Sequence, residues 1–379
     1  MAVWPFIPQH GVRETLIFKS DVIRAYNAEQ RIALTRAPRQ MLEFEYLLDG
    51  RDFARAKAMV YGAGTAMWAL PNWTEMLAIG DWPAAQQTQV IDTDNLDFRN
   101  GDYALLIQDN DTSQSLGVNI TLGATTVDAG APTAIGYYPA YIVPLRTAYM
   151  PSGARFDRTH PTHARARVEW AVVDGADLSA AHDFDTYRTY PVMTDRAVVL
   201  SDFAETIQRH FDAVDYGLAP PALDTIHAQA AQRSVAAWSC QTKAELWRLR
   251  CWLHTCKGRQ KAFWMPTWAE DFTLRQDVLS ADTVLHVESV EYATYYGLRH
   301  IMVLKRDGTR IYLRVTSGAA ETGGDALTLS AAVGQNIAMA DVDRVCLLNL
   351  MRFGSDRFEI RHRPGGADMS TLVEEVPAE

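Results

Sequence analysis

The sequence is poor in cysteine and contains no long apolar run. The lack of a long apolar run excludes a protein that crosses a membrane with helices. No segment reaches the roughly 18 consecutive apolar residues that a membrane-spanning helix requires. Residues 1–6 also lack the basic stretch and apolar core of a secretory signal. We therefore expect a protein without a membrane span that is made in the cytoplasm and stays there until it assembles.

The few cysteines follow neither a metal-binding nor a disulfide pattern. Cys-x-x-Cys spacing is absent, and the four residues are not shared between the halves of the chain: Cys240, Cys251, Cys256 and Cys346. We predict that these thiols are reduced and buried.

Basic side chains are also in short supply relative to acidic ones. The chain has 36 Lys and Arg against 46 Asp and Glu, a formal net charge of -10. Nucleic-acid-binding surfaces neutralise phosphates with basic residues, so this balance argues against sequence-specific nucleic-acid binding. It is compatible with lining a DNA conduit, because a weakly repulsive wall lets DNA slide.

What the sequence does contain is enough apolar material for more than one core. Its 379 residues are 48% hydrophobic and 22% charged, as in ordinary folded proteins. This length exceeds a single compact core and predicts two domains of somewhat under 200 residues each.

An internal repeat supports two domains. Residues 67–75 and 263–270 each read aromatic, apolar, proline, polar, tryptophan, with one residue of slack before the proline. Pro71 then aligns with Pro266, and self-similarity of this kind indicates a duplicated unit. The residues of this structural motif are Trp68, Pro71, Trp73, Phe263, Trp264, Pro266 and Trp268.

The order of elements around the motif agrees in the two copies. Each copy is predicted to have an apolar strand and then an arginine-led strand, at 15–18 and 39–46 in the first copy and at 197–200 and 233–240 in the second. In the arginine-led strands, Phe44 and Trp238 are predicted to hold equivalent places.

One long helix is expected next in each copy, over 50–61 and 243–256. Asp49 or Asp52 is placed to cap the first helix and Thr242 to cap the second. Each copy then predicts a hairpin and two closing strands, with an Asp-Gly turn at 307–308 in the second copy.

These elements predict a mainly β (α+β) fold with two tandem β-barrel or sandwich modules, each carrying one packed helix. The first module is assigned to residues 1–178 and the second to 190–379. Residues 179–189 lose the periodic apolar pattern and are predicted to form a linker.

Candidate catalytic groups are few, and none forms a convincing set. His160 and His163 beside Asp157 lack a third metal ligand at a useful spacing. Glu43 and Glu45 share a strand face as a hydrolytic pair would, but the other copy has no carboxylates at the matching positions. Ser239, Cys240 and His254 follow no protease order, and the paired glycines at 62, 64, 323 and 324 lack the lysine of a phosphate loop. We predict no catalytic, cofactor-binding or metal-binding residue and a protein that is not an enzyme.

The repeated tryptophans have two interpretations. Trp73 and Trp268 could stack on sugars or bases, or they could fill a module core or a subunit interface while the prolines fix a strand entry. Repetition in both copies favours the structural interpretation, since a scaffold must rebuild its core in each copy.

Several strings resemble distal-tail and related baseplate proteins of long-tailed bacteriophages. Residues 4–8 read Trp-Pro-Phe-Ile-Pro, and 258–268 read Gly-Arg-Gln-Lys-Ala-Phe-Trp-Met-Pro-Thr-Trp. Residues 352–360, and shorter strings at 18–22, 29–31 and 38–39, are similar to the same group. The resemblance implies a structural virion protein: a ring component at the tail tip that joins the tail tube to the hub or tip proteins.

This chain departs from that family because it has two modules where the usual distal-tail protein has one. Tail tubes of that family are hexameric rings, and the tail tips are trimeric. Three chains would supply six modules, so we expect a trimer with a pseudo-sixfold ring. A hexamer with twelve modules is the alternative. The tail tube protein and the baseplate hub are the expected partners, with the tape-measure protein a further candidate. A carbohydrate- or receptor-binding baseplate protein is the second functional hypothesis, and a tail-associated glycan hydrolase is the third.

Overall fold

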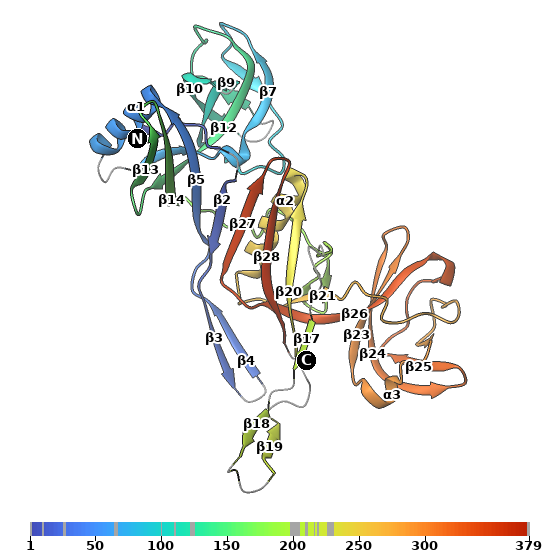
Figure 1. Ribbon diagram of the computed structural model, residues 1–379. Coiled ribbons are helices and arrows are strands. Elements are labelled where there is room, and N and C mark those ends of the chain that lie inside the picture. The colour runs from blue at the N-terminus through green and yellow to red at the C-terminus, as the bar shows by residue number, and fades with distance from the viewer. Residues whose placement is uncertain are drawn as a thin grey trace.

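The computed structural model describes most of the chain. The described residues are 2–9, 11–25, 28–63, 67–99, 101–109, 111–121, 126–197, 205–208, 211–215, 217, 220–225 and 231–376. Strands dominate, so the predicted mainly-β class is confirmed (Figure 1). None of the described helices is long and apolar enough to cross a membrane.

We call β1 to β14 the first half. Its elements are β1 (Ala2–Val3), β2 (Arg13–Ile17), β3 (Ser20–Ala25), β4 (Ala28–Ala33), β5 (Arg39–Asp49), α1 (Gly50–Ala63), β6 (Trp68–Pro71), η1 (Trp73–Glu75), β7 (Leu77–Trp82), β8 (Thr88–Val90), β9 (Tyr103–Gln108), β10 (Asp111–Thr121), β11 (Thr126–Asp128), β12 (Tyr137–Tyr149), β13 (Ala154–His160) and β14 (His163–Val172).

We call β15 to β28 the second half. Its elements are β15 (Thr186–Tyr187), β16 (Tyr190–Pro191), β17 (Glu205–Gln208), β18 (Phe211–Val214), β19 (Ala222–Thr225), β20 (Ala231–Cys240), α2 (Lys243–Cys256), β21 (Phe263–Pro266), β22 (Val284–Val287), α3 (Tyr292–Tyr295), β23 (Arg299–Lys305), β24 (Arg310–Glu321), β25 (Gly324–Leu329), η2 (Met339–Asp341), β26 (Val342–Phe353), β27 (Arg357–Arg363) and β28 (Gly366–Glu375).

Both halves pair their strands in the same order. In the first half β5 pairs with β14, β6 and β9 with β12, and β10 with β9 and β11. In the second half β20 pairs with β28, β21 and β23 with β26, and β24 with β23 and β25. The halves therefore share one topology, while the boundaries at 178 and 190 stay a prediction.

The pairing register fixes which residues are equivalent. Pro71 lies opposite Leu145, and Pro266 lies opposite Leu348. With the prolines matched, Phe263 takes the place of Trp68 and no slack is needed, so the predicted one-residue offset is wrong.

The predicted match between Phe44 and Trp238 is also wrong, by two residues. In the second half, Trp238 of β20 lies opposite Met369, six residues before Glu375, where β28 pairs with β26. In the first half, Ala166 lies six residues before Val172, where β14 pairs with β12, and the residue opposite Ala166 is Tyr46. Tyr46, and not Phe44, is therefore equivalent to Trp238. A shift of two keeps each side chain on the same face of its strand, which is why the sequence pattern hid it.

The two helices match their predictions more closely. The Asp52 amide donates to Asp49 Oδ1 over 2.8 Å, so Asp49 is the residue that caps α1. The Glu245 amide donates to Thr242 Oγ1 over 3.2 Å at the start of α2. Lys257 ends α2 in the left-handed conformation. The short helix α3 was not predicted.

The sheets stay open, so the barrel alternative is wrong. Among the described residues, the outer strands β7 and β8 pair only with β12 and β11. Their edges meet through a side chain, because Gln89 Nε2 donates to the Ile79 carbonyl over 2.7 Å. A side-chain bridge replaces the backbone ladder that would close a barrel.

The predicted linker at 179–189 has structure of its own. It contains β15, which pairs with β16, and its Phe184 packs against the core of the second half. Of the predicted strand at 197–200, residues 198–200 lie outside the described residues. The strand that pairs with β20 as β2 pairs with β5 is instead β17.

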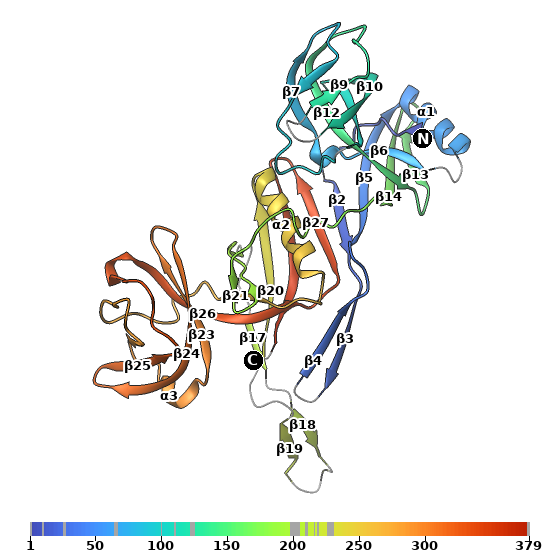
Figure 2. The same ribbon diagram turned by 180° about the vertical axis from the view of Figure 1, so that it is seen from behind.

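Strand β2 joins the two halves. It pairs with β5 of the first half on one edge and with β27 of the second half on the other. Its Leu16, and Phe18 just after it, are buried in the core of the second half. Figure 2 shows β2 and β27 side by side at the centre of the molecule, beside α2.

Two hairpin arms extend in the same direction from the central sheet. One arm is β3 and β4, which follows β2, and the other is β18 and β19, which follows β17 (Figure 1). The arms thus follow equivalent strands, since β2 pairs with β5 and β17 pairs with β20.

Candidate functional site

The residues of the repeated motif lie mainly in the cores. Trp68 and Phe263 hold equivalent strand positions, and both are buried in the main core of their half. Trp264 is buried in a separate small cluster and donates from Nε1 to the Tyr187 carbonyl over 2.8 Å. These three residues therefore fill cores and present no open platform for a ligand.

The second tryptophans of the motif differ between the halves. Trp73 is buried in the short helix η1. Trp268 is only partly buried and has a left-handed backbone, with φ of 59°. Equivalent residues therefore have different surroundings, and Trp268 lies beside a cavity described below.

The candidate catalytic groups are not brought together. His160 Nδ1 and His163 Nδ1 each lie 2.8 Å from Thr162 Oγ1 in an exposed turn. Within the part of the chain that the structure describes, no group of three His, Cys, Asp or Glu could hold a metal ion. Glu43 and Glu45 lie within ion-pair distance of Arg167, at 3.5 and 3.7 Å.

The thiol candidates are buried. All four cysteines are unpaired and buried, as predicted. Burial raises the pKa of the Cys251 thiol to about 11 and that of Cys240 to about 12. Ser239 Oγ donates to Asp368 Oδ1 over 2.6 Å, whereas His254 Nδ1 accepts the Leu178 amide over 3.2 Å, so the two groups bond to different partners.

The most concentrated buried charge in the described chain lies between the two halves. Arg250 of α2 lies 2.6 Å from Glu14 of β2, measured from Nη2 to Oε2, and also contacts Glu75 of η1. The side chains of Arg250 and Glu14 are 5% and 0% exposed. One second-half cation is therefore held by two first-half carboxylates, away from solvent.

Neighbouring groups complete the bonding of Glu14. Gln40 Nε2 donates to Oε1 over 2.8 Å, and His362 Nε2 lies 2.9 Å from Oε2. Burial by itself would raise the pKa of Glu14, but the Arg250 charge and the His362 bond hold it well below the usual range. Burial likewise opposes the charge of Arg250, yet Glu14 and Glu75 keep its pKa above the usual range. Both groups are therefore charged at neutral pH.

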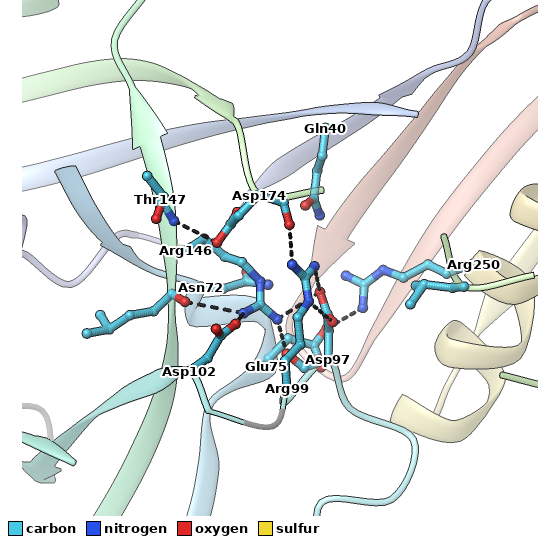
Figure 3. Close-up of polar contacts among 12 residues, drawn as sticks. Gln40, Asn72, Glu75, Asp97, Arg99, Asp102, Arg146, Thr147, Asp174 and Arg250 are labelled. Atoms are coloured by element: carbon cyan, nitrogen blue, oxygen red, sulfur yellow. Dashed lines mark hydrogen bonds and ion pairs between the residues drawn. The ribbon is translucent and has the colours of Figure 1, made fainter. Parts of the chain in front are cut away.

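A second ion cluster lies beside the first (Figure 3). Arg99 Nη2 and Arg146 Nη2 each lie 2.9 Å from Asp97 Oδ2, and Arg146 Nη1 lies 3.5 Å from Asp102. The Thr147 amide donates to Asp174 Oδ2 over 2.9 Å. This cluster fixes the loop before β9 against β12, on the side of the first half that faces α2.

The space between the clusters is too small for an organic ligand. The cavity lined by Glu14, Gln40, Asp97 and Arg250 has a volume of about 20 Å³, enough for roughly one water molecule. Its charged groups satisfy one another. We therefore interpret it as a structural joint between the halves.

Sequence reasoning missed this joint. The available signal was an arginine among apolar residues of a helix: Leu249 and Cys251 flank Arg250 directly. A charge in that position needs a buried partner. Its partners lie 236 and 175 residues away, and no local pattern names them.

Comparison with known proteins does not identify the chain. Neither a protein-family model nor a curated protein matches it. The function is therefore argued from the geometry and the sequence motifs.

Replacing Arg250 by methionine should lower the free energy of unfolding by about 3–5 kcal/mol, because Glu14 and Glu75 would stay buried without a cation. Arg248→Met is the matched control on the same helix. Arg248 is partly exposed and contacts Asp195, Thr194 and the Phe184 ring, none of which would be left as a buried unpaired charge, so its loss should cost less, about 1 kcal/mol. Urea unfolding of both variants is the measurement. Equal stabilities of the two variants would contradict the assigned role of Arg250.

His254 predicts a loss of stability in mild acid. Its Nδ1 accepts the Leu178 amide over 3.2 Å, and burial lowers its pKa from 6.5 to about 4 despite the nearby Asp177. The unfolded chain therefore binds a proton first as pH falls. The contribution of neutral His254 to the free energy of unfolding is complete above pH 6.5. It is lost as pH falls toward 4, by roughly 3 kcal/mol in total. Unfolding of His254→Asn between pH 7 and 4 should show a weaker pH dependence than the parent chain. Parallel curves would refute the assignment.

Proposed function

We propose that this protein is a structural component of a bacteriophage tail tip, a distal-tail or baseplate ring protein that joins the tail tube to the hub or tip. The observation that carries the proposal is the edge-to-edge pairing of β2 with β27. It joins two units of one topology in a head-to-tail manner. The motifs at 4–8, 258–268 and 352–360, which resemble distal-tail proteins, support the same conclusion.

A head-to-tail joint suits a ring. In such a joint one surface of a unit contacts a different surface of the next unit, so the contact can repeat until the ring closes. Three copies would place six units around an axis and give a pseudo-sixfold ring with true threefold symmetry. This arrangement would match a hexameric tube on one side and a trimeric tip on the other.

The arms and the charge are consistent with this role. Both arms extend from the same side of the central sheet, where they could contact a neighbouring ring such as the tail tube (Figure 1). The net charge of -10 suits a wall past which DNA moves. The virion is then the site of action, after synthesis in the host cytoplasm.

Carbohydrate or receptor binding is the second candidate. It is favoured by a cavity of about 170 Å³ lined by Trp268, Gln232, Asn349 and Thr267, which combines an aromatic surface with amide groups. A glycan hydrolase has less support. Its candidate carboxylates, Glu43 and Glu45, pair with Arg167 on the solvent-facing side of β5.

Imaging of the purified protein by electron microscopy should reveal closed rings with threefold symmetry and six similar densities. The mass in solution should equal three chains. Rings of six chains with strict sixfold symmetry would refute the trimer while retaining the ring. A protein that stays monomeric at high concentration and binds glycans would refute the structural role and favour the second candidate.

A further inference from the structure

The joint inside the chain has a counterpart on the surface of the molecule. Because the two halves share one pairing register, each residue of the internal joint has an equivalent in the other half. The internal joint uses the β2 side of the first half and the β27 side of the second half. The equivalents are the β17 side of the second half and the β13 side of the first half.

The strand edges are the first part of this counterpart. Among the described residues β17 pairs only with β20, and β13 pairs only with β14. Leu16 and Ile207 lie opposite Gln40 and Gln232, which are equivalent. Leu16 is 3% exposed in the internal joint, whereas Ile207 is 71% exposed.

The helices are the second part. Both are 14 residues long, and when their first residues are matched, Lys57 of α1 takes the place of Arg250 and Tyr61 takes the place of His254. His254 is 4% exposed, whereas Tyr61 is 83% exposed. The α1 surface therefore carries a cation and an aromatic ring in solvent where α2 carries its buried contacts.

The carboxylates are the third part. With Pro71 and Pro266 matched, Glu270 is equivalent to Glu75, which binds Arg250. Glu75 is buried, whereas Glu270 is exposed. The β17 backbone also places Glu205 at the position that Glu14 has in β2. Lys57 on one surface and Glu270 on the other thus carry opposite charges, as Arg250 and Glu75 do in the internal joint.

The cavity beside Trp268 is the fourth part. Its lining residues Gln232, Thr267 and Asn349 are equivalent to Gln40, Asn72 and Arg146 of the first half. Gln40 and Asn72 line the small cavity at Arg250, and Arg146 lies in the neighbouring ion cluster. Trp268 Nε1 is buried and lacks a hydrogen-bond partner among the described residues. The cavity therefore occupies the place where α2 rests in the internal joint.

We propose that a second copy of this chain binds here and repeats the internal joint. Strand β17 of one copy adds antiparallel to β13 of the next, with Thr206 opposite Arg155 and Ile207 opposite Ala154. Helix α1 of the next copy covers the cavity beside Trp268, and its Lys57 binds Glu270. Ile207 then packs against the partly buried apolar residues that border the first-half core: Phe53, Met59, Val60, Ala154 and Phe156. This inference rests on the proposed ring and specifies its contacts.

Disulfide trapping tests the strand register. The native cysteines are buried, so Thr206→Cys combined with Arg155→Cys introduces the only two exposed thiols of the described chain. Directly opposed strand residues have the separation a disulfide needs. Oxidation should link copies covalently up to the closed ring. Thr206→Cys with Arg165→Cys is the control, because Arg165 is exposed but lies in β14, away from the joint. It should remain unlinked between copies.

Charge reversal tests the helix contact. Lys57→Glu or Glu270→Lys should each weaken assembly at least about tenfold, because like charges would face each other. The double variant should recover most of the loss, and Lys57→Arg, which copies the internal joint, should assemble at least as well as the parent chain. The measurement is the concentration at which assemblies dissociate, by sedimentation. Circular dichroism should show all four variants folded, since both sites are exposed.

The outcomes separate the joint from the proposed function. Parent rings that persist in Lys57→Glu, with no 206–155 cross-link, would overturn this joint and leave the ring standing. Cross-linked open filaments without closed rings would support the joint and overturn the ring. A parent chain that never self-associates would overturn both.

Discussion

The fixed relation between the two halves depends on one buried contact, the Arg250 guanidinium between Glu14 and Glu75. Three charges with almost no exposure are stable together only when their geometry is maintained, since a small displacement would leave a charge without a partner. The backbone pairing of β2 with β27 sets the distance between the halves, and the charges set their orientation. Both features come from β2, because Glu14 faces α2 while its backbone bonds to β27. The joint within the chain is therefore both strong and directional.

The difference between arginine and lysine at equivalent helix positions fits this account. Arg250 makes several hydrogen bonds at once from a planar, weakly hydrated group, which suits a contact formed once when the chain folds. Lys57 is exposed, and an ammonium group is well hydrated while a chain awaits its neighbour. The contact within the chain thus uses arginine, and the contact proposed between chains uses the more strongly hydrated lysine. Tyr61 and Ile207 fit the same account, because both are largely exposed in the single chain and neither packs in its core.

Much of the fold could be predicted from local patterns. The Pro71 and Pro266 repeat, the two capped helices and the paired hairpins are encoded within short segments, and the structure has them. The wrong match of Trp238 with Phe44 arose because Phe44 and Tyr46 are two residues apart on one strand, and a strand repeats its facing every two residues. The sharing of β2 between halves could not be predicted, since a strand edge carries no mark of its distant partner. The Arg250 joint was missed for the same reason, since its partners are distant in the sequence. The motif tryptophans were found because they repeat within short segments.

Amide hydrogen exchange of the monomeric and assembled protein tests most directly whether one joint geometry serves both within and between chains. Strand β2 has partners on both edges, so its amides at 15–17 should exchange slowly in both states. In β17, the amides directed away from β20 should exchange quickly in the monomer and slowly in the assembly. Equal exchange of 206–208 in the two states, or protection confined to other strands such as the arms, would contradict the account.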